Sequence, residues 1–265
     1  MNTSRTLLLL VVMLSLGSAG CASKPRADSS ADDPLDTLEN AEANTADEKP
    51  VDPYETFNRK VFAFNMTLDR WVLKPVSKGY KAVTPDPVEA GVGNFFLNLL
   101  EVPNIFNDVL QWKWKQAGND SGRLLINSTV GIVGLFDVAR HTGLERGTGE
   151  DFGQTLVTWG VPEGPYIMLP ILGPRTVSDA AGIPVNWVTH PLTYLESRTA
   201  AWSLYALDTV HTRAGLLETE KLASGDLYVF LRDAYLQRRK YLLNDGVVED
   251  DFGDFSEDSE ESFDF

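Results

Sequence analysis

The feature that most constrains this chain is its single cysteine, Cys21, which lies directly after a short apolar segment. Arg5 precedes that apolar segment, residues 7–16, and small residues lead from it to the cysteine. A helix needs about 20 apolar residues to cross a bilayer, so this segment is too short to span one. The combination of positive start, apolar stretch and small-residue exit predicts a secretory signal peptide over residues 1–20.

A lone cysteine at that exit predicts a bacterial lipoprotein whose Cys21 thiol carries a diacylglyceryl group. Ser18 occupies position −3, where a branched aliphatic residue is usual, so an ordinary signal peptide with an incidental cysteine remains the alternative. Use of the only thiol as an anchor excludes disulfides and thiolate metal sites. Ala22 follows the cysteine, where inner-membrane lipoproteins commonly carry Asp. We therefore expect a lipid anchor at the periplasmic leaflet of the outer membrane.

The net charge of −15 is concentrated in the two ends of the chain. Residues 1–50 carry −4 and residues 247–265 carry −9, whereas residues 51–246 carry only −2. A nearly neutral body lacks the basic field that nucleic acid attracts, so no nucleic-acid partner is expected. The composition predicts a disordered linker over 21–51 and a disordered acidic tail over 247–265. Because four phenylalanines interrupt the acids of that tail, a docking peptide is its alternative interpretation.

Residues 54–71 repeat apolar side chains every three or four positions, which predicts an amphipathic helix. Asp52 and Pro53 precede it and are typical of an N-cap and a first-turn proline. Further helices are expected over 88–100, 103–115, 120–130, 195–220 and 226–244. No stretch shows the sustained two-residue alternation of a half-buried strand. The predicted fold is therefore mainly α, as a single domain over residues 52–246.

Two apolar segments fit neither a surface helix nor a polar loop. The first, 127–139, contains two glycines, and the second, 152–174, contains four prolines. Pro165, Pro170 and Pro174 exclude a regular helix there and argue against a central strand. Irregular apolar backbone is tolerated where it packs on protein or lines a cavity. These segments are either buried parts of the core, or a hairpin or channel wall in contact with lipid.

Four stretches carry a resemblance that extends over almost all of residues 52–245. They read DPYETFNR at 52–59, LINSTVGIVGLFDVA at 125–139, EDFGQTLVTWGVPEGPYIMLPILGP at 150–174 and DLYVFLRDAYLQRR at 226–239. In sequence and in order they resemble the MlaA (VacJ) family of outer-membrane lipoproteins. The linker and the acidic tail lie outside the shared pattern, so the resemblance implies nothing about them.

The resemblance implies a ring of helices in the inner leaflet of the outer membrane, around a central amphipathic channel. It also implies an activity: phospholipids that have strayed into the outer leaflet are removed and passed to a periplasmic, MlaC-like carrier. A trimeric outer-membrane porin is the expected membrane partner. The direction of transport comes from the resemblance alone.

Two other classes of function were weighed against phospholipid transport. A lipase would need an activated nucleophile, but the chain has no G-x-S-x-G elbow. Its three histidines have no metal-ligand spacing, and no phosphate-binding GxxxxGK[ST] loop is present, so we expect no catalysis, metal or cofactor. A structural lipoprotein that scaffolds porins or other envelope proteins remains the alternative. A scaffold should have a wetted surface, whereas a lipid conduit should expose an apolar belt and lining.

The sequence nominates a small set of functional residues. Phe57, Phe64 and Trp71 form one helical stripe that faces either lipid or the core. Arg123 and Asn127 are polar candidates for the lipid path. Because glycine adopts backbone conformations that other residues resist, the segment 131–137 is the candidate for a gating hairpin. Its nominated members are Gly131, Gly134, Leu135, Phe136 and Asp137.

Overall fold

The computed structural model describes residues 52–223 and 225–247, and it confirms a mainly α fold. The α-helices are α3 (Glu55–Leu68), α4 (Lys74–Val83), α5 (Asp86–Leu110), α6 (Trp114–Thr129), α7 (Phe152–Thr158), α8 (Val177–Thr189), α9 (Arg198–Gly215) and α10 (Leu227–Leu243). A π-helical turn, η1 (Asp69–Leu73), joins α3 to α4. Short 3₁₀ turns are η2 (Ala139–Thr142), η3 (Pro191–Tyr194) and η4 (Thr219–Leu222), and the strands are β1 (Tyr166–Leu169) and β2 (Gly173–Thr176).

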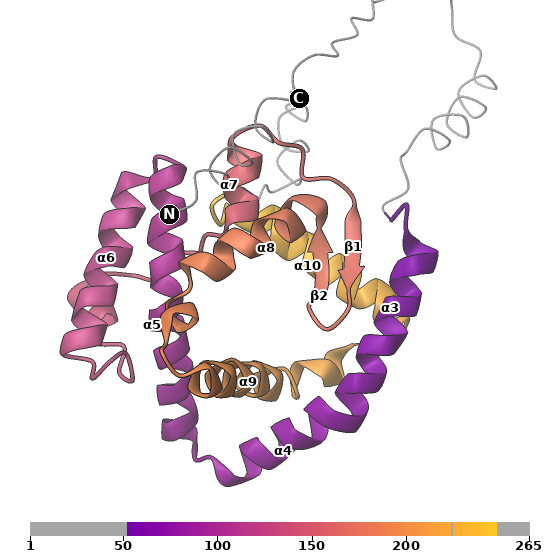
Figure 1. The fold of residues 1–265 in the computed structure, drawn as a ribbon, viewed down its shortest axis with the longest axis horizontal. Coiled ribbons are helices and arrows are strands. Elements are labelled where there is room, and N and C mark those ends of the chain that lie inside the picture. Colours follow the sequence, from indigo (N-terminus) through magenta and orange to yellow (C-terminus); the bar gives the residue numbers. More distant parts are fainter. Residues whose placement is uncertain (1–51, 224, 248–265) are drawn as a thin grey trace, which may run out of the picture. The chain divides into compact units, whose positions relative to one another are not determined.

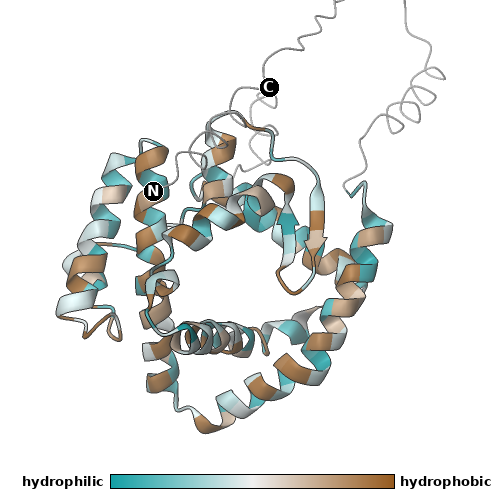
Figure 2. Cartoon of the chain, in the orientation of Figure 1, coloured by the Kyte–Doolittle hydropathy of each residue, from teal (hydrophilic) through white to brown (hydrophobic). Residues whose placement is uncertain are grey.

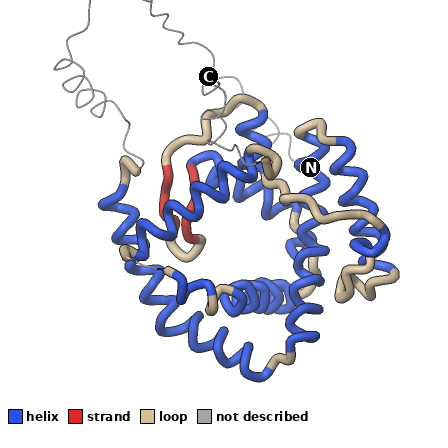
Figure 3. The backbone as a smooth tube through the Cα atoms, turned by 180° about the vertical axis from the view of Figure 1, so that it is seen from behind, coloured by secondary structure: helices blue, strands red, loops and turns tan. Residues whose placement is uncertain are grey.

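The described residues form a ring of helices, as the resemblance implied (Figure 1). Helices α3 and α4 make one side of the ring, α5 makes the next, and α6 packs on the outside of α5. Helix α9 packs on α4, while α8 packs on α7 and α5. The β-hairpin contacts α3 and α10, which closes the circle, and the view from behind shows the same arrangement (Figure 3).

Helices α3 and α4 continue into each other through the π-helical turn η1. The N–H of Lys74 donates to the carbonyl of Asp69, five residues back. Pro75 follows and has no N–H, so one helical hydrogen bond cannot form there. A π-turn beside a proline widens the helix locally and lets the chain continue with a bend. The predicted helix over 54–71 is thus part of a longer curved arm.

Helix α5 corrects the prediction of two helices over 88–100 and 103–115. It runs unbroken through Pro103, although proline costs about 3 kcal/mol in a helix interior. Packing of α5 along α6 outweighs that cost, and Asn107 Nδ2 caps the Pro103 carbonyl at 2.8 Å. Trp114 and Lys115, placed in the earlier helix by the prediction, begin α6 instead.

Other helix boundaries also depart from the prediction. Helices α4, α7 and α8 were not predicted, and α9 is shorter than the expected 195–220. The first helix begins at Glu55, because Asp52 Oδ1 accepts the N–H of Tyr54 and shapes a turn before the helix. Helix α10 matches its predicted range to within one residue at each end.

The proline-rich segment forms a two-stranded antiparallel hairpin after the short helix α7. Tyr166 pairs with Thr176 and Leu169 pairs with Gly173, so Pro174 lies within an edge strand, where its missing N–H is tolerated. The outer edge of β1 is covered by two asparagines of α3, seven residues apart. Asn58 donates to the carbonyl of Tyr166 at 3.3 Å and accepts the N–H of Met168 at 2.8 Å. In the same way, Asn65 donates to the carbonyl of Leu169 and accepts the N–H of Ile171. These side chains satisfy backbone groups that the two-stranded sheet leaves free.

The distribution of polarity is inverted relative to a water-soluble domain. Among the described residues, 18 polar or charged side chains are buried, against nine hydrophobic ones. A small apolar core lies under the hairpin around Tyr166, Met168 and Tyr228. All six tryptophans are at least half exposed, and hydrophobic and hydrophilic residues alternate along the helices of the ring (Figure 2). No helix in the described part of the chain has both the length and the hydrophobicity to cross a bilayer.

Candidate functional site

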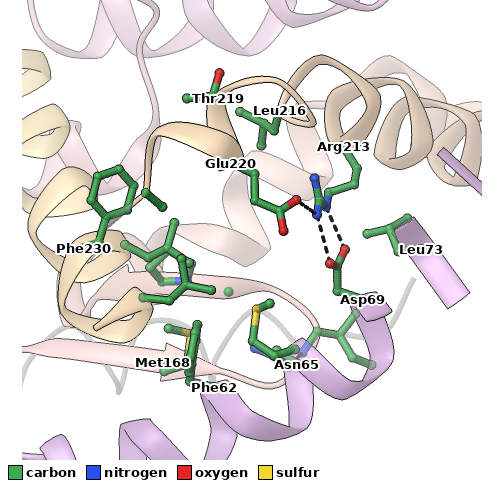
Figure 4. A pocket seen from close by; sticks show the side chains of 17 residues that line it. Phe62, Asn65, Asp69, Leu73, Met168, Arg213, Leu216, Thr219, Glu220 and Phe230 are labelled. Atoms are coloured by element: carbon green, nitrogen blue, oxygen red, sulfur yellow. Dashed lines mark hydrogen bonds and ion pairs between the residues drawn. The ribbon is translucent and has the colours of Figure 1, made fainter. Parts of the chain in front are cut away.

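Two cavities lie on either side of the hairpin tip, and Ile171 lines both of them. The first has a volume of about 350 Å³ and is almost entirely apolar. It lies between α3, the hairpin, the end of α9 and α10 (Figure 4). Its lining includes Phe62, Met66, Leu73, Met168, Leu216, Phe230 and Leu231.

A cluster of ion pairs closes one side of the first cavity (Figure 4). Arg213 binds both oxygens of Asp69, at 2.7 and 3.0 Å, and reaches Glu220 at 2.7 Å. Lys74 Nζ binds the other Glu220 oxygen at 2.6 Å. Hydrogen bonds from Lys74 and Arg213 hold the pKa of Glu220 below its ordinary value. Two cations and two anions balance here, so the cluster ties α9 and η4 to the α3–α4 arm and leaves the cavity without net charge.

The second cavity is larger, about 820 Å³, and amphipathic. It lies between the hairpin tip, α8, α9 and α10. Its apolar wall contains Leu172, Ile183, Trp187, Trp202 and Leu242. Its polar wall contains Asp151, Arg175, Asp179, Tyr235, Arg238 and Arg239.

The carboxylates of the second cavity are held by neighbouring groups. Asp151 caps α7 through the N–H of Gln154 at 2.9 Å and pairs with Arg239. Burial opposes the Asp151 charge, but the Arg239 guanidinium holds its pKa below the ordinary range. Asp179 accepts the Tyr235 hydroxyl at 2.7 Å and Arg175 Nη1 at 3.3 Å. Burial, together with the charge of Asp179, raises the pKa of Tyr235 and keeps this hydroxyl a donor.

Arg123 and Asn127 lie outside both cavities, in a buried ionic network between α5, α6 and the turn that follows α6. Arg123 is fully buried and contacts Glu101 at 3.1 Å and both oxygens of Asp137, at 2.9 and 3.0 Å. Asn127 donates to Asp137 at 3.0 Å and accepts the N–H of Ala139 at 2.9 Å. Burial opposes the Asp137 charge, and Asn127 and Arg123 hold its pKa below the ordinary value. The network anchors the turn; these two side chains have no surface with which to contact lipid.

The segment 130–136 is a compact turn packed on α5, without strands. A Cβ on Gly131 would lie 2.3 Å from the carbonyl oxygen of Phe136, and one on Gly134 would lie 2.6 Å from Asn98. Both positions therefore require glycine. Leu135 is fixed through its carbonyl, which accepts Asn94 Nδ2 at 3.2 Å.

The same turn holds two β-branched residues in the left-handed region of the backbone. The φ angles of Ile132 and Val133 are 52° and 57°, a conformation that is unfavourable for branched side chains. Both side chains are exposed, as is Phe136. The turn thus accepts strain while it presents apolar groups outward, and a gating role for it stays a proposal.

The predicted stripe of Phe57, Phe64 and Trp71 lies on an exposed face of α3 and η1. Their exposed fractions are 52%, 55% and 76%, which excludes the alternative that they pack in the core. The opposite face of the same arm supplies Phe62 and Met66 to the first cavity. The arm therefore separates an outer apolar surface from an inner apolar lining. Cys21, the linker and the acidic tail lie outside the described residues.

The sequence reasoning missed the residues that shape the cavities. Asn58 and Asn65 lie seven residues apart on one helix face, and that spacing is the signal that they act together. The pair Arg238 and Arg239 near the end of α10 was noticed only as part of a motif.

Comparison with known proteins places the chain among lipoproteins. A family model described as MlaA lipoprotein matches residues 50–242. An uncharacterised protein of Rickettsia typhi is 37% identical over 193 residues, which cover 71% of this chain and 76% of the relative. The intermembrane phospholipid transport system lipoprotein MlaA of Escherichia coli strain K12 is 33% identical over 220 residues, which cover 78% of this chain and 84% of that one. A structure solved to explain the maintenance of bacterial outer-membrane lipid asymmetry matches with a TM-score of 0.65 and 34% identity, and covers 73% of this chain and 99% of that chain.

Proposed function

The chain belongs to the MlaA lipoprotein family, and from this premise we propose that it removes mislocalised phospholipids from the outer leaflet of the outer membrane. It acts as the outer-membrane lipoprotein of an intermembrane phospholipid transport system and so maintains lipid asymmetry. The proposed transport is retrograde: lipid passes through the ring toward the periplasm.

The observation that carries this proposal is the pairing of an apolar and an amphipathic cavity at one hairpin tip inside the ring. A phospholipid with about 30 methylenes has roughly 24 kcal/mol of apolar transfer free energy at ~0.8 kcal/mol per group. Its acyl chains therefore need continuous apolar contact, while its charged headgroup needs polar partners. The first cavity meets the former requirement and the second meets the latter.

The outer surface supports a position within the lipid leaflet. Exposed apolar side chains cover the α3–α4 arm and the turn after α6, and exposed tryptophans are typical of membrane interfaces. Such a surface fits the acyl region of the inner leaflet or the lipid-facing wall of a trimeric porin. We propose both as neighbours, with a periplasmic MlaC-like carrier as the acceptor of the lipid.

The lipid anchor belongs to the same proposal. Attachment through Cys21 would hold the body at the periplasmic leaflet, and a linker of about 31 residues would reach about 100 Å when fully extended. Catalysis has no part in this scheme: the relative from Escherichia coli is named as a transport lipoprotein, and in our proposal the ring binds and guides its ligand without a covalent step.

The test is a charge placed in the apolar lining. In Leu216→Glu, a carboxylate enters the first cavity, whereas in the control Gln237→Glu it lies on an exposed and already polar position of α10 that lines neither cavity. We expect Leu216→Glu to lower the phospholipid that co-purifies in mild detergent and to raise outer-leaflet phospholipid in cells. The control should behave like wild type in both assays.

Two outcomes would contradict the proposal. One is normal lipid asymmetry in cells that contain full amounts of Leu216→Glu. The other is wild-type protein that co-purifies with porin but without phospholipid, which would favour the scaffold alternative.

A further inference from the structure

The polar wall of the second cavity has a surplus of positive charge. Three arginines line it, Arg175, Arg238 and Arg239, against two carboxylates, Asp151 and Asp179. His190 adds no charge near neutral pH, because burial lowers its pKa. The tyrosine Tyr235 stays protonated, since its pKa is raised. One positive charge in this wall therefore has no counter-ion among the lining residues.

The two carboxylates are already bound within the protein. Arg239 holds Asp151 through both terminal nitrogens, and Asp179 is shared by Tyr235 and Arg175. Arg238 makes no ion pair or hydrogen bond with the described residues. It is the guanidinium that remains available to a ligand.

Two further donors in this wall lack partners. The Nε–H groups of Arg175 and Arg239 are buried and donate to no hydrogen-bond acceptor among the described residues, and the Arg239 side chain is only 3% exposed. Glu163 forms an ion pair with Arg239 Nε at 4.0 Å, a distance that is too long for a hydrogen bond. Buried donors are nearly always satisfied in native proteins, so two buried guanidinium donors without an acceptor show that the positive charge of this wall is incompletely matched.

We infer that Arg238, in a wall that also contains Arg175 and Arg239, binds the phosphate of the transported phospholipid. The planar guanidinium matches phosphate oxygens two at a time, which makes arginine well suited to this ligand. Trp187, Trp202 and Leu172 line the apolar wall of the same cavity, and Ile171 lines both this cavity and the first. The headgroup would thus lie at the arginines while the acyl chains extend past the hairpin tip. This inference rests on the proposed function and specifies the group by which the lipid is recognised.

The test compares lipids with and without phosphate on the full-length protein in detergent. Native mass spectrometry measures binding of phosphatidylglycerol and of diacylglycerol with the same acyl chains, with inorganic phosphate as a separate probe. We expect wild type to prefer phosphatidylglycerol, and Arg238→Gln to reduce that preference by about tenfold, the effect of losing one charge-assisted contact. Arg238→Lys should restore part of it, because the positive charge returns without the fork geometry.

The control is Arg198→Gln, which removes an exposed arginine of α9 that lines neither cavity. An unchanged preference in Arg238→Gln would overturn the phosphate site while leaving transport intact. If inorganic phosphate binds wild type as tightly as phosphatidylglycerol, the wall is a free-anion site and the headgroup assignment is wrong. Wild type that binds neither lipid would instead overturn the proposed function.

Discussion

At the scale of single residues, the buried charges of α5 and α6 bear on stability more than on lipid contact. Arg123 is enclosed with Glu101 and Asp137, and Arg146 adds longer contacts of 3.6 and 3.7 Å to the same carboxylates. A buried arginine with several acceptors keeps its charge, and its removal leaves those acceptors uncompensated.

We predict that Arg123→Met lowers the free energy of unfolding by about 3–5 kcal/mol, because buried Glu101 and partly buried Asp137 lose their nearest counter-charge and retain only the longer contacts with Arg146. Arg59→Met is the control, since Arg59 pairs with Glu55 and Asp226 in an exposed setting and its loss should have a much smaller effect. Denaturation in mild detergent measures both. Equal losses of unfolding free energy in the two variants would mean that the buried ion pairs stabilise the fold no more than the exposed ones do.

A second prediction concerns Asp108, which is fully buried in α5. Burial, together with the carboxylates of Asp120 and Glu150, raises its pKa from 3.8 to about 8. Between these values the folded protein binds a proton that the unfolded chain has released. The contribution of Asp108 to stability is therefore complete below pH 4 and is lost as the pH rises through 8.

We expect Asp108→Asn to remove this dependence, because the amide resembles the protonated acid at every pH. The wild-type melting temperature should fall by more than that of the variant between pH 5 and pH 8.5. If the melting temperatures of the two proteins changed in parallel with pH, Asp108 would be ionised in the folded protein, and the prediction of a raised pKa would be wrong.

At the scale of elements, the sequence predicted structure where periodicity was local and failed where distant contacts decide. The range of α10 was predictable to within a residue because its apolar spacing and the capping Asp226 lie together in the chain. Helix α5 was not, because packing on α6 carries it through Pro103. The stripe on α3 was recognised as a stripe, but one chain alone could not say whether lipid or core lies against it.

The candidate site followed the same division. The turn 130–136 could be recognised from its two glycines, because a glycine-rich apolar segment is visible in the local sequence. The cavities were not, because each is built from elements that lie far apart in the chain, such as Phe62 of α3 and Phe230 of α10 in the first cavity. Arg123 and Asn127 were predicted to line the lipid path because they are polar residues among apolar neighbours. Only the fold shows that their hydrogen-bonding groups are already bound to Glu101, Asp137 and the Ala139 amide.

The attachment of the hairpin to α3 gives the prediction at this scale. Asn58→Ala would leave the Tyr166 carbonyl and the Met168 N–H without partners in a buried setting, at about 1–3 kcal/mol per group. Asn65→Ala should cost less, because its contact with Ile171 is exposed and water can replace it. Hydrogen exchange measures the result: Met168 should lose protection in the first variant and keep it in the second. Unchanged protection of Met168 in Asn58→Ala would mean that β2 alone holds the hairpin.

At the scale of the whole molecule, the inverted polarity explains why the ring needs a lipid environment. Hydrophobic burial normally drives folding, yet here most large apolar side chains lie on the outside or in cavities, while ion pairs and amide networks connect the helices. In water such a surface is a liability, since exposed apolar patches lead to association. In a leaflet the same surface is favourable, and the buried polar contacts give the ring a defined shape.

The last prediction separates the anchor from the body. In Cys21→Ser, the site proposed for lipidation is removed while the ring is left intact. If the anchor alone held the protein, the variant would be released as a soluble periplasmic species. Because Trp71, Phe64 and the exposed face of the 130–136 turn remain, we expect Cys21→Ser to stay bound to membranes and to float with phospholipid vesicles. Adding Phe64→Ser and Trp71→Ser should release it, since each change removes apolar area that the bilayer would otherwise cover. Retention of the triple variant would point to a protein partner, in place of the leaflet, as what holds the ring at the membrane.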